Sequence, residues 1–296
     1  MTVRASTNLE AYRMQSLTDT YTLNNGVEIP VVGFGTWQTP DGDVAYQSVK
    51  SALDAGYRHI DTAAAYGNEE SVGRGIKDSS VDRHDIFLTT KLWNDDHGYE
   101  STKQALDVSL QKLETDYVDL YLIHWPNPIK FRDDWEDINA ETWRAMEEAY
   151  RDGKVRAIGV SNFRPSHLTT LMKTATITPA VNQNYLNPSD MQPEVTRVNA
   201  QYNILNEAYS PLGTGELLQV KALQDMATKY QHSVPQVILR WSLQHHFLPL
   251  PKSTHADRIK DNTNLFDFKI SDEDMQTIDG LHGTTRLATD PDETNF

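Results

Sequence analysis

The stretch Asp85-Ile86-Phe87-Leu88-Thr89-Thr90-Lys91 contains the pattern that decides the fold: a short apolar run, typical of a buried strand, that ends at a polar side chain. Residues 57–61 and 117–124 repeat the pattern, and Tyr66 lies one loop beyond the first of them. In a parallel α/β architecture, the carboxyl ends of the strands form the edge at which chemistry takes place. We therefore expect four polar groups to meet there: Asp61, Tyr66, Lys91 and His124.

Short apolar strands alternate with helical patterns along most of the chain, which predicts eight strand–helix units. Strands are expected at roughly 31–34, 58–61, 86–91, 117–124, 156–160, 180–184, 204–209 and 247–250. Helices are expected near 42–56, 68–78, 99–114, 138–152, 165–174, 190–200, 219–246 with a break before Pro235, and 255–263. Strand ends spaced about 25–40 residues apart indicate an α/β fold of the closed (β/α)8 TIM barrel type.

Two local signals refine this fold. The alternation in residues 21–29 around Asn25-Gly26 predicts an N-terminal β-hairpin. The turn at Gly33-Phe34-Gly35-Thr36-Trp37-Gln38 lacks the third glycine of a dinucleotide-binding Rossmann turn, which disfavours a doubly wound sheet. Because no linker or low-complexity tract interrupts the chain, we expect residues 21–296 to form a single domain and residues 1–20 a flexible N-terminal extension.

Composition narrows the class of protein. The 296 residues include 27 Lys plus Arg and 42 Asp plus Glu, and the net charge of −15 argues against a nucleic-acid or membrane-surface partner. An anionic ligand must therefore be bound by a local basic cluster. The absence of cysteine excludes disulfides and thiolate chemistry, and no metal is required by the four polar groups. Without an apolar N-terminal run, we expect a cytoplasmic protein. The expected oligomeric state is a monomer or a weak dimer.

The four polar groups suit proton transfer to a carbonyl compound. A phenol has a reference pKa of about 10, and a nearby ammonium, Lys91, is expected to lower the pKa of Tyr66. Asp61 would keep Lys91 charged, and His124 would orient or polarise a carbonyl group. Taken singly, each has a structural alternative, since Asp61 would also suit a helix cap, Lys91 a solvated loop and His124 a satisfied, half-buried position.

The residues that flank the four polar groups strengthen the functional interpretation. With their flanking residues, the four groups lie in three motifs: Gly56-Tyr57-Arg58-His59-Ile60-Asp61-Thr62-Ala63 with Tyr66-Gly67-Asn68-Glu69, Thr90-Lys91-Leu92-Trp93, and Asp119-Leu120-Tyr121-Leu122-Ile123-His124-Trp125-Pro126. In these motifs the chain resembles the aldo-keto reductase family, NADPH-dependent carbonyl reductases on a (β/α)8 barrel, and the resemblance covers residues 21–296. The early end of the chain implies a short carboxy-terminal loop, as in the bacterial branch related to diketogluconate reductases.

The resemblance implies a role for each matching residue. Tyr66 would be the general acid, tuned by Lys91 and Asp61, with His124 at the carbonyl. The cofactor NADPH/NADP+ would contact groups along the barrel mouth: Thr36 and Trp37, then Ser161, Asn162 and Gln183 at the nicotinamide carboxamide, Tyr209 stacked beneath the ring, and Ser210, Leu212 and Glu216 over the pyrophosphate and ribose. The alternative for Tyr209 is a plain core aromatic.

The basic cluster that the overall acidity requires is found at residues 252–262. It comprises Lys252, Ser253, Thr254, Arg258 and Asn262. Two cations and hydroxyls near a helix N-terminus suit a phosphate dianion, and the family resemblance implies the adenosine 2′-phosphate. A solvated first helical turn is the alternative. Asp261 departs from the family pattern, which frequently has Glu, and residues 184–188 depart from it at the sixth strand's loop.

Aromatic residues are expected to wall the substrate site. Trp37, Trp93 and Trp125, together with residues 127–135, would form an apolar, shape-selective mouth that accepts a range of aldehydes and ketones. Trp241 is assigned to the core. The pair His245-His246 is assigned to a surface or end-of-helix role instead of a metal site, because adjacent helical residues point to different faces.

The leading interpretation is an NADPH-dependent reductase of aldehydes and ketones. The competing class is a cofactor-sensing, non-catalytic interaction protein on the same barrel, which the intact set of four polar groups and the absence of a docking segment disfavour. Reduction of a conjugated carbon–carbon double bond occurs in relatives that carry Glu in place of the histidine, and His124 argues against it.

Overall fold

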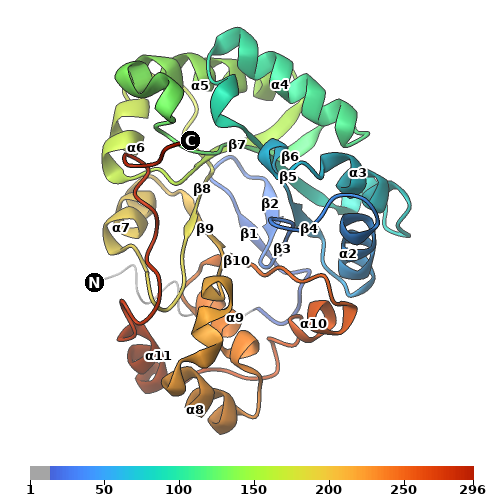
Figure 1. The fold of residues 1–296 in the computed structure, drawn as a ribbon, viewed down its shortest axis with the longest axis vertical. Helices are drawn as coiled ribbons and strands as arrows, with labels where there is room; N and C mark the ends of the chain where they lie inside the picture. Colours follow the sequence, from blue (N-terminus) through green and yellow to red (C-terminus); the bar gives the residue numbers. More distant parts are fainter. Residues whose placement is uncertain (1–13) are drawn as a thin grey trace.

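Eight parallel strands form a barrel surrounded by helices in the computed structural model, which describes residues 14–296 (Figure 1). The strands pair in the order β10-β9-β8-β7-β6-β5-β4-β3. Backbone hydrogen bonds close the circle, since the amides of Gly33 and Gly35 donate to the carbonyls of Pro249 and Pro251 at 3.1 and 3.0 Å. The prediction of a (β/α)8 barrel is thereby confirmed.

The strands of the structure are β1 Thr20–Thr22, β2 Glu28–Pro30, β3 Phe34–Gly35, β4 His59–Asp61, β5 Phe87–Leu92, β6 Val118–Ile123, β7 Val155–Ser161, β8 Val181–Tyr185, β9 Leu205–Tyr209 and β10 Leu248–Leu250. The helices are α2 Asp43–Asp54, α3 Glu69–Lys77, α4 Tyr99–Lys112, α5 Trp135–Arg151, α6 Pro165–Leu171, α7 Pro193–Gln201, α8 Lys221–Tyr230, α9 Val234–Gln244, α10 Ala256–Asp261 and α11 Asp272–Asp279. Short 3-10 turns lie at η1 Ala64–Tyr66, η2 Arg83–Asp85, η3 Asn94–Asp96, η4 Ile129–Asp134 and η5 Gly213–Gln219.

The strand and helix predictions agree with these bounds to within a few residues, with two differences. The first barrel strand begins at Phe34 rather than at residue 31, because the amide of Val31 donates to Asp19 near the hairpin instead of to a barrel strand. The helix α11 was not predicted. The expected break in residues 219–246 occurs at Gln231, which has a left-handed φ of 56°, and Pro235 lies in the first turn of α9.

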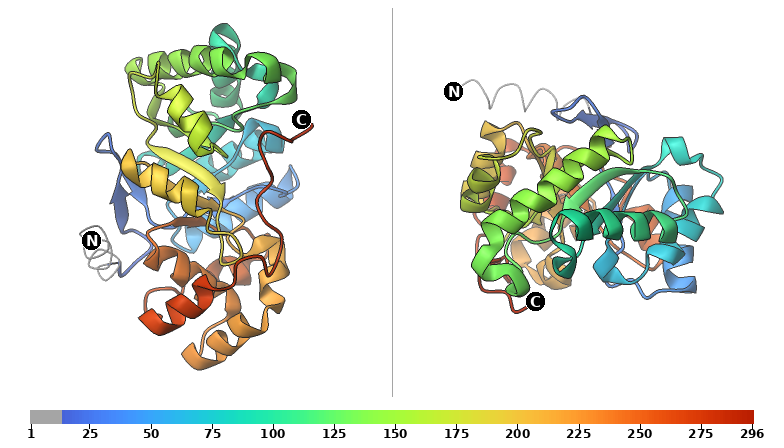
Figure 2. Two further views of the ribbon diagram at one scale, coloured as in Figure 1. Left: turned by 90° about the vertical axis from the view of Figure 1, so that its left-hand side faces the viewer. Right: turned by 90° about the horizontal axis from the view of Figure 1, so that it is seen from above.

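The hairpin β1–β2 covers the end of the barrel at which the strands begin. Its turn carries Asn25-Gly26, and Gly26 has a φ of 84°, which glycine adopts without steric cost. The side-chain amides of Asn24 and Asn25 donate to the backbone carbonyls of Pro179 and Arg156, beside the starts of β8 and β7. The chain's C-terminal segment lies at the opposite end (Figure 2), where the strands end.

The division into an extension at 1–20 and a domain at 21–296 stays a prediction, because residues 1–13 lie outside the described residues. Within the described part, the packed chain begins before residue 21. Met14 is buried, the Tyr21 hydroxyl donates to its sulfur at 3.7 Å, and β1 starts at Thr20.

Strand register fixes which polar residues share the upper edge of the barrel. Asp61 pairs with Thr89, Ser161 with Gln183, and Gln183 with Glu207. Because paired residues of neighbouring strands lie on the same face, these side chains meet inside the barrel mouth. Apolar residues fill the strand interiors, Trp241 is buried as expected, and among residues 14–296 no helix has the length and apolarity needed to cross a membrane.

Gly159 offers a test of how tightly the barrel wall is packed. A Cβ at this position in β7 would lie 2.6 Å from the Val181 carbonyl oxygen and 2.8 Å from a Leu122 methyl group. We expect Gly159→Ala to lower the free energy of unfolding by about 1–3 kcal/mol, the usual cost of overpacking.

Urea denaturation of the Gly159→Ala protein checks this expectation. Gly280→Ala is the matched control, because its Cβ would lie 3.4 Å or more from any atom and its φ is −74°. The control should leave stability unchanged or raise it by up to about 1 kcal/mol. Equal losses in both variants would contradict the packing argument.

Candidate active site

A buried lysine connects three of the four predicted polar groups. The ammonium of Lys91 donates to Asp61 Oδ1 at 2.7 Å, to the Thr62 carbonyl at 2.9 Å and to Tyr66 Oη at 3.2 Å. An ammonium has three hydrogens, so all its donors are satisfied. Lys91 is 0% exposed and lies behind Asp61, which excludes the alternative of a solvated loop lysine.

The pKa of Tyr66 differs from the expectation. Burial raises the pKa of Tyr66 to about 12, and although Lys91 lowers it, the Asp61 carboxylate acts in the opposite direction. The prediction of a lowered pKa was therefore wrong, because desolvation of the phenolate outweighs the attraction of the ammonium. Burial alone would lower the pKa of Lys91, but Asp61 and then Tyr66 raise it above its ordinary value.

His124 faces Tyr66 across the same site. Its ring centroid lies 5.8 Å from that of Tyr66 and 5.4 Å from that of Trp93, with both pairs edge to face. Burial holds the pKa of His124 well below its ordinary value, and the charge of Lys91 lowers it further. The imidazole is therefore neutral near pH 7. A neutral ring can donate a hydrogen bond to a carbonyl oxygen.

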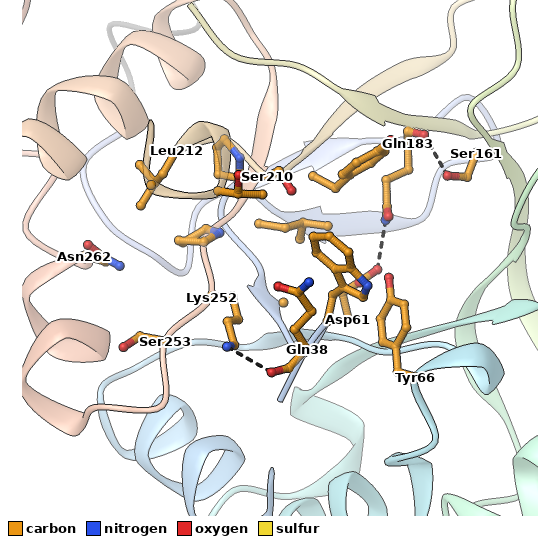
Figure 3. Close-up of a pocket in the computed structure, with 18 of the residues that line it drawn as sticks. Gln38, Asp61, Tyr66, Ser161, Gln183, Ser210, Leu212, Lys252, Ser253 and Asn262 are labelled. Atoms are coloured by element: carbon orange, nitrogen blue, oxygen red, sulfur yellow. Dashed lines mark hydrogen bonds between the residues drawn. The ribbon is translucent and has the colours of Figure 1, made fainter. Parts of the chain in front are cut away.

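A cavity of about 1100 Å³ opens at the carboxyl ends of the strands and contains most of the predicted site. Its lining includes these predicted residues: Trp37, Asp61, Tyr66, Trp93, His124, Trp125, Ser161, Asn162, Gln183, Tyr209, Ser210, Leu212, Lys252, Ser253, Arg258 and Asn262. Figure 3 shows that Asp61 and Tyr66 lie at one end of the site and that Ser253 and Asn262 lie at the other.

Four predicted residues, Lys91 among them, do not line the cavity. Thr36 is buried and donates to the Asp61 carbonyl at 2.9 Å. Glu216 accepts a hydrogen bond at 3.2 Å from the backbone amide of Arg286, in the C-terminal segment. Thr254 is exposed outside the lining. The roles predicted for these residues stay predictions.

The residues expected at the nicotinamide form one connected group. The Ser161 hydroxyl donates to the backbone carbonyl of Gln183 at 2.8 Å, and the side-chain amide of Asn162 donates to the backbone carbonyl of His124 at 3.1 Å. Tyr209 donates to Asn162 Oδ1 at 2.8 Å, and burial raises its pKa above the ordinary value. Asn162 adopts a φ of 60°, a conformation that asparagine tolerates better than most residues. Tyr209 thus presents its ring, rather than its hydroxyl, for contact.

The basic end of the cavity is formed by β10 and the residues that follow it. Lys252 donates to the Gln38 carbonyl at 3.2 Å, a contact drawn in Figure 3, and burial lowers the pKa of Lys252. Arg258 is exposed and lines the same end. Because α10 has only 6 residues, the side chains rather than a helix dipole supply the positive potential here.

The aromatic wall differs in one part from the expectation. Trp93 stacks on Phe296 at 6.0 Å, and Trp125 meets the same ring edge to face at 5.1 Å. Residues 127–135 do not line the cavity. They bind the C-terminal segment instead, since the Arg132 guanidinium donates to the Thr294 carbonyl at 2.6 Å.

Sequence reasoning missed several lining residues and two buried groups. The missed lining residues include Gln38, Leu218, Ser233, Arg286, Thr289 and Phe296. No sequence pattern indicates that a residue as remote as Phe296 reaches the catalytic end. The missed buried groups are His59 and Glu207, and they were detectable, because alternate residues of a predicted barrel strand point inward.

Two further features bear on metal binding. Across residues 14–296, no group of three or more His, Cys, Asp or Glu side chains is arranged to hold a metal ion. His245 is paired with Asp279 at 2.7 Å, and the ring of His246 packs edge to face on Tyr21 at 4.2 Å, so the two histidines point to different neighbours.

Comparisons with known proteins agree with this geometry. The model of the aldo/keto reductase family matches residues 31–282. The chain is 49% identical to glyoxal reductase of Bacillus subtilis over 281 residues, which is 95% of this chain and 99% of that protein.

Among solved structures, an aldo/keto reductase from Brucella melitensis is 48% identical with a TM-score of 0.83, covering 88% of this chain and 98% of that one. An aldo-keto reductase of Bombyx mori in complex with NADP is 36% identical with a TM-score of 0.82, covering 92% of this chain and 95% of that one.

The buried histidine His97 gives a testable pH dependence of stability. Burial lowers the pKa of His97 to about 3 from an ordinary value of 6.5. Below pH 6.5 the unfolded chain therefore binds a proton that the folded protein does not bind until about pH 3, so stability is lost as the pH falls. Replacing His97 should therefore remove its contribution to the loss of stability at low pH.

We expect His97→Gln to reduce the slope of unfolding free energy against pH by about 1 kcal/mol per pH unit between about pH 6 and pH 5. Urea denaturation at several pH values measures this slope. The exposed His282→Gln is the control and should leave it unchanged. An unchanged slope in His97→Gln would show that this histidine is protonated in the folded protein.

Proposed function

The chain belongs to the aldo/keto reductase family and is an NADPH-dependent carbonyl reductase, and we propose that it converts aldehydes and ketones to alcohols with Tyr66 as the proton donor. One observation carries this proposal. Inside the cavity, Tyr66 Oη accepts a hydrogen bond from Lys91, which is in turn paired with Asp61. The cytoplasmic location, the small-molecule carbonyl substrate and the monomeric or weakly dimeric state expected from the sequence belong to the same proposal.

The residues present fit the cofactor NADPH. The cavity has cationic groups at one end, Lys252 and Arg258, and the proton-transfer groups at the other. We propose that the first pair binds the 2′-phosphate, and that Ser161, Asn162 and Gln183 bind the carboxamide beside the face of Tyr209. The Bombyx mori relative, described as a complex with NADP, supports NADP(H) as the cofactor.

NADPH, when bound, supplies the hydride that the carbonyl carbon accepts. Tyr66 keeps its proton near neutral pH, because burial raises its pKa to about 12. An alkoxide is a much stronger base than a phenolate, so the proton moves from Tyr66 to the substrate oxygen as negative charge develops there. Lys91 stabilises the phenolate that remains, at an Nζ–Oη distance of 3.2 Å. His124, neutral and facing the cavity, orients the carbonyl oxygen.

The wall of the cavity favours small or planar aldehydes and ketones. The Trp93, Trp125 and Phe296 rings leave few hydrogen-bonding groups near His124, so shape selects the substrate. The likeness to a glyoxal reductase supports an aldehyde as the substrate class. The intact contacts of Lys91 favour catalysis over the alternative of a non-catalytic, cofactor-sensing protein.

Tyr66→Phe tests the proton donor. The change removes the phenolic hydroxyl and little volume, so turnover should fall about 10²- to 10⁴-fold, the range for loss of a general acid, while cofactor affinity stays nearly constant. Steady-state kinetics with an aldehyde and fluorescence titration with NADPH measure the two quantities. Tyr121→Phe, a buried tyrosine outside the cavity, is the control. Turnover within threefold of wild type would contradict the assignment.

Arg258→Ala tests cofactor recognition. NADPH differs from NADH only by the 2′-phosphate, and a charge-assisted hydrogen bond contributes about 1.5–3 kcal/mol, partly screened at an exposed site. We therefore expect about 10- to 100-fold weaker binding of NADPH and little change for NADH. Lys260→Ala, on the same helix but outside the cavity lining, should leave both affinities unchanged. Equal weakening of both cofactors in Arg258→Ala would refute a phosphate site.

A further inference from the structure

The side-chain amide of Gln183 bridges two buried carboxyl groups. Its Nε2 donates to Asp61 Oδ2 at 2.9 Å and to Glu207 Oε2 at 2.7 Å. All three residues are nearly inaccessible to water, with exposed fractions of 1% for Gln183, 2% for Asp61 and 0% for Glu207. Figure 3 shows the contact between Gln183 and Asp61. The proton-transfer chemistry described above leaves Glu207 without a role.

Strand register brings Glu207 and Gln183 together. They are paired residues of the parallel strands β9 and β8, so their side chains lie on the same face, inside the barrel. The residue paired with Glu207 on its other side is the apolar Leu248 of β10. Across the barrel, His59 Nε2 of β4 lies 3.7 Å from Glu207 Oε1, and that oxygen has no hydrogen-bond partner among the described residues. Gln183 is thus the close polar partner of Glu207.

The two carboxyl groups decide which way the amide of Gln183 points. A primary amide has two N–H hydrogens and one carbonyl oxygen. Both hydrogens are directed at carboxyl oxygens, so the carbonyl oxygen, Oε1, is the polar atom left for a ligand in a residue that lines the cavity. If the amide rotated by half a turn, Oε1 would meet the Asp61 carboxylate, which the ammonium of Lys91 holds in place at 2.7 Å.

We propose that Glu207 is a positioning residue, which fixes the amide of Gln183 so that its carbonyl oxygen accepts a hydrogen bond from the N–H group of the cofactor's carboxamide. This inference rests on the proposed function, since it takes the nicotinamide end of NADP(H) as the ligand. Without an acceptor at position 207, one buried N–H of Gln183 would lose its partner, and Asp61 alone would hold the amide. The amide would then tilt away from this fixed direction, and its carbonyl oxygen would no longer be aimed at the carboxamide N–H.

The arrangement holds in either charge state of Glu207. Burial raises the pKa of Glu207 to about 8, with Asp61 acting in the same direction and the Gln183 hydrogen bond and Lys91 opposing them. The proton of the neutral form can reside on Oε1, toward His59, while Oε2 continues to accept from Gln183. Burial keeps His59 uncharged, with a pKa lowered to about 3. A carboxyl group therefore serves as a permanent acceptor at this position.

The test compares NADP+ with its 3-acetylpyridine analogue, in which a methyl group replaces the carboxamide nitrogen. Titration calorimetry measures affinity without turnover. Wild-type protein should bind NADP+ about 3- to 10-fold more tightly than the analogue, the contribution of one hydrogen bond. In Glu207→Met, which removes the acceptor at similar volume, this preference should fall below about twofold. Glu207→Gln, which keeps an acceptor oxygen, should restore it.

Adenosine 2′,5′-bisphosphate, which lacks the nicotinamide, is the control ligand, and its affinity should be the same in all three proteins. The inference is overturned if wild-type protein binds NADP+ and the analogue equally, a result that needs no variant. It is overturned as well if Glu207→Met keeps the full preference for NADP+. It is also overturned if Glu207→Met weakens the bisphosphate as much as NADP+, because Glu207 would then merely support the fold. Failure of the proposed function would differ, since wild-type protein would bind none of the three ligands.

Discussion

The buried positive charge of Lys91 is the constraint on which the site depends. An ammonium with no exposed surface is costly unless it is paired and all its hydrogens are bonded, and both conditions are met by Asp61, the Thr62 carbonyl and Tyr66. These partners come from β4 and the turn after it, while Lys91 belongs to β5. The charge therefore stabilises one arrangement of two neighbouring strand ends. Such a pair is weak support for stability by itself, and its value here lies in holding a phenol beside an ammonium.

The same charge organises the opposite wall of the barrel. Asp61 uses one oxygen for Lys91 and the other for Gln183, so the ion pair and the amide share a carboxylate. Gln183 continues the chain of contacts to Glu207 in β9, and its backbone carbonyl accepts from Ser161 in β7. Five of the eight barrel strands are thereby linked through one buried polar network. Because Asp61 and Gln183 each contact two members of this network, their side chains are held in fixed directions, which suits a site that must present directed hydrogen bonds.

Sequence reasoning located the strand ends well and predicted the environments of their side chains poorly. The apolar runs that stop at Asp61, Lys91 and His124 can be recognised in the sequence. The barrel topology then brings these three polar side chains together. The direction of the pKa shift of Tyr66 was missed, because it depends on how completely the phenol is buried, and burial depends on loops folded over the strand ends. The contacts of Glu216 and Phe296 were equally hidden, since both are set by the path of the C-terminal segment across the barrel mouth.

The sequence predicts some parts of the site and misses others because different kinds of contact hold these parts in place. Asp61, Lys91 and Gln183 are fixed by backbone ladders whose register is set by the hydrophobic pattern, so a local sequence pattern suffices to place them. The rings of Trp93, Trp125 and Phe296 are carried by loops and held mainly by one another, together with contacts such as that of Arg132 with Thr294. The groups proposed to transfer the proton and the surfaces proposed to select the carbonyl compound are thus supported by different parts of the fold. A change in the loops can alter the shape of the cavity while the ammonium, carboxylate and phenol keep their distances.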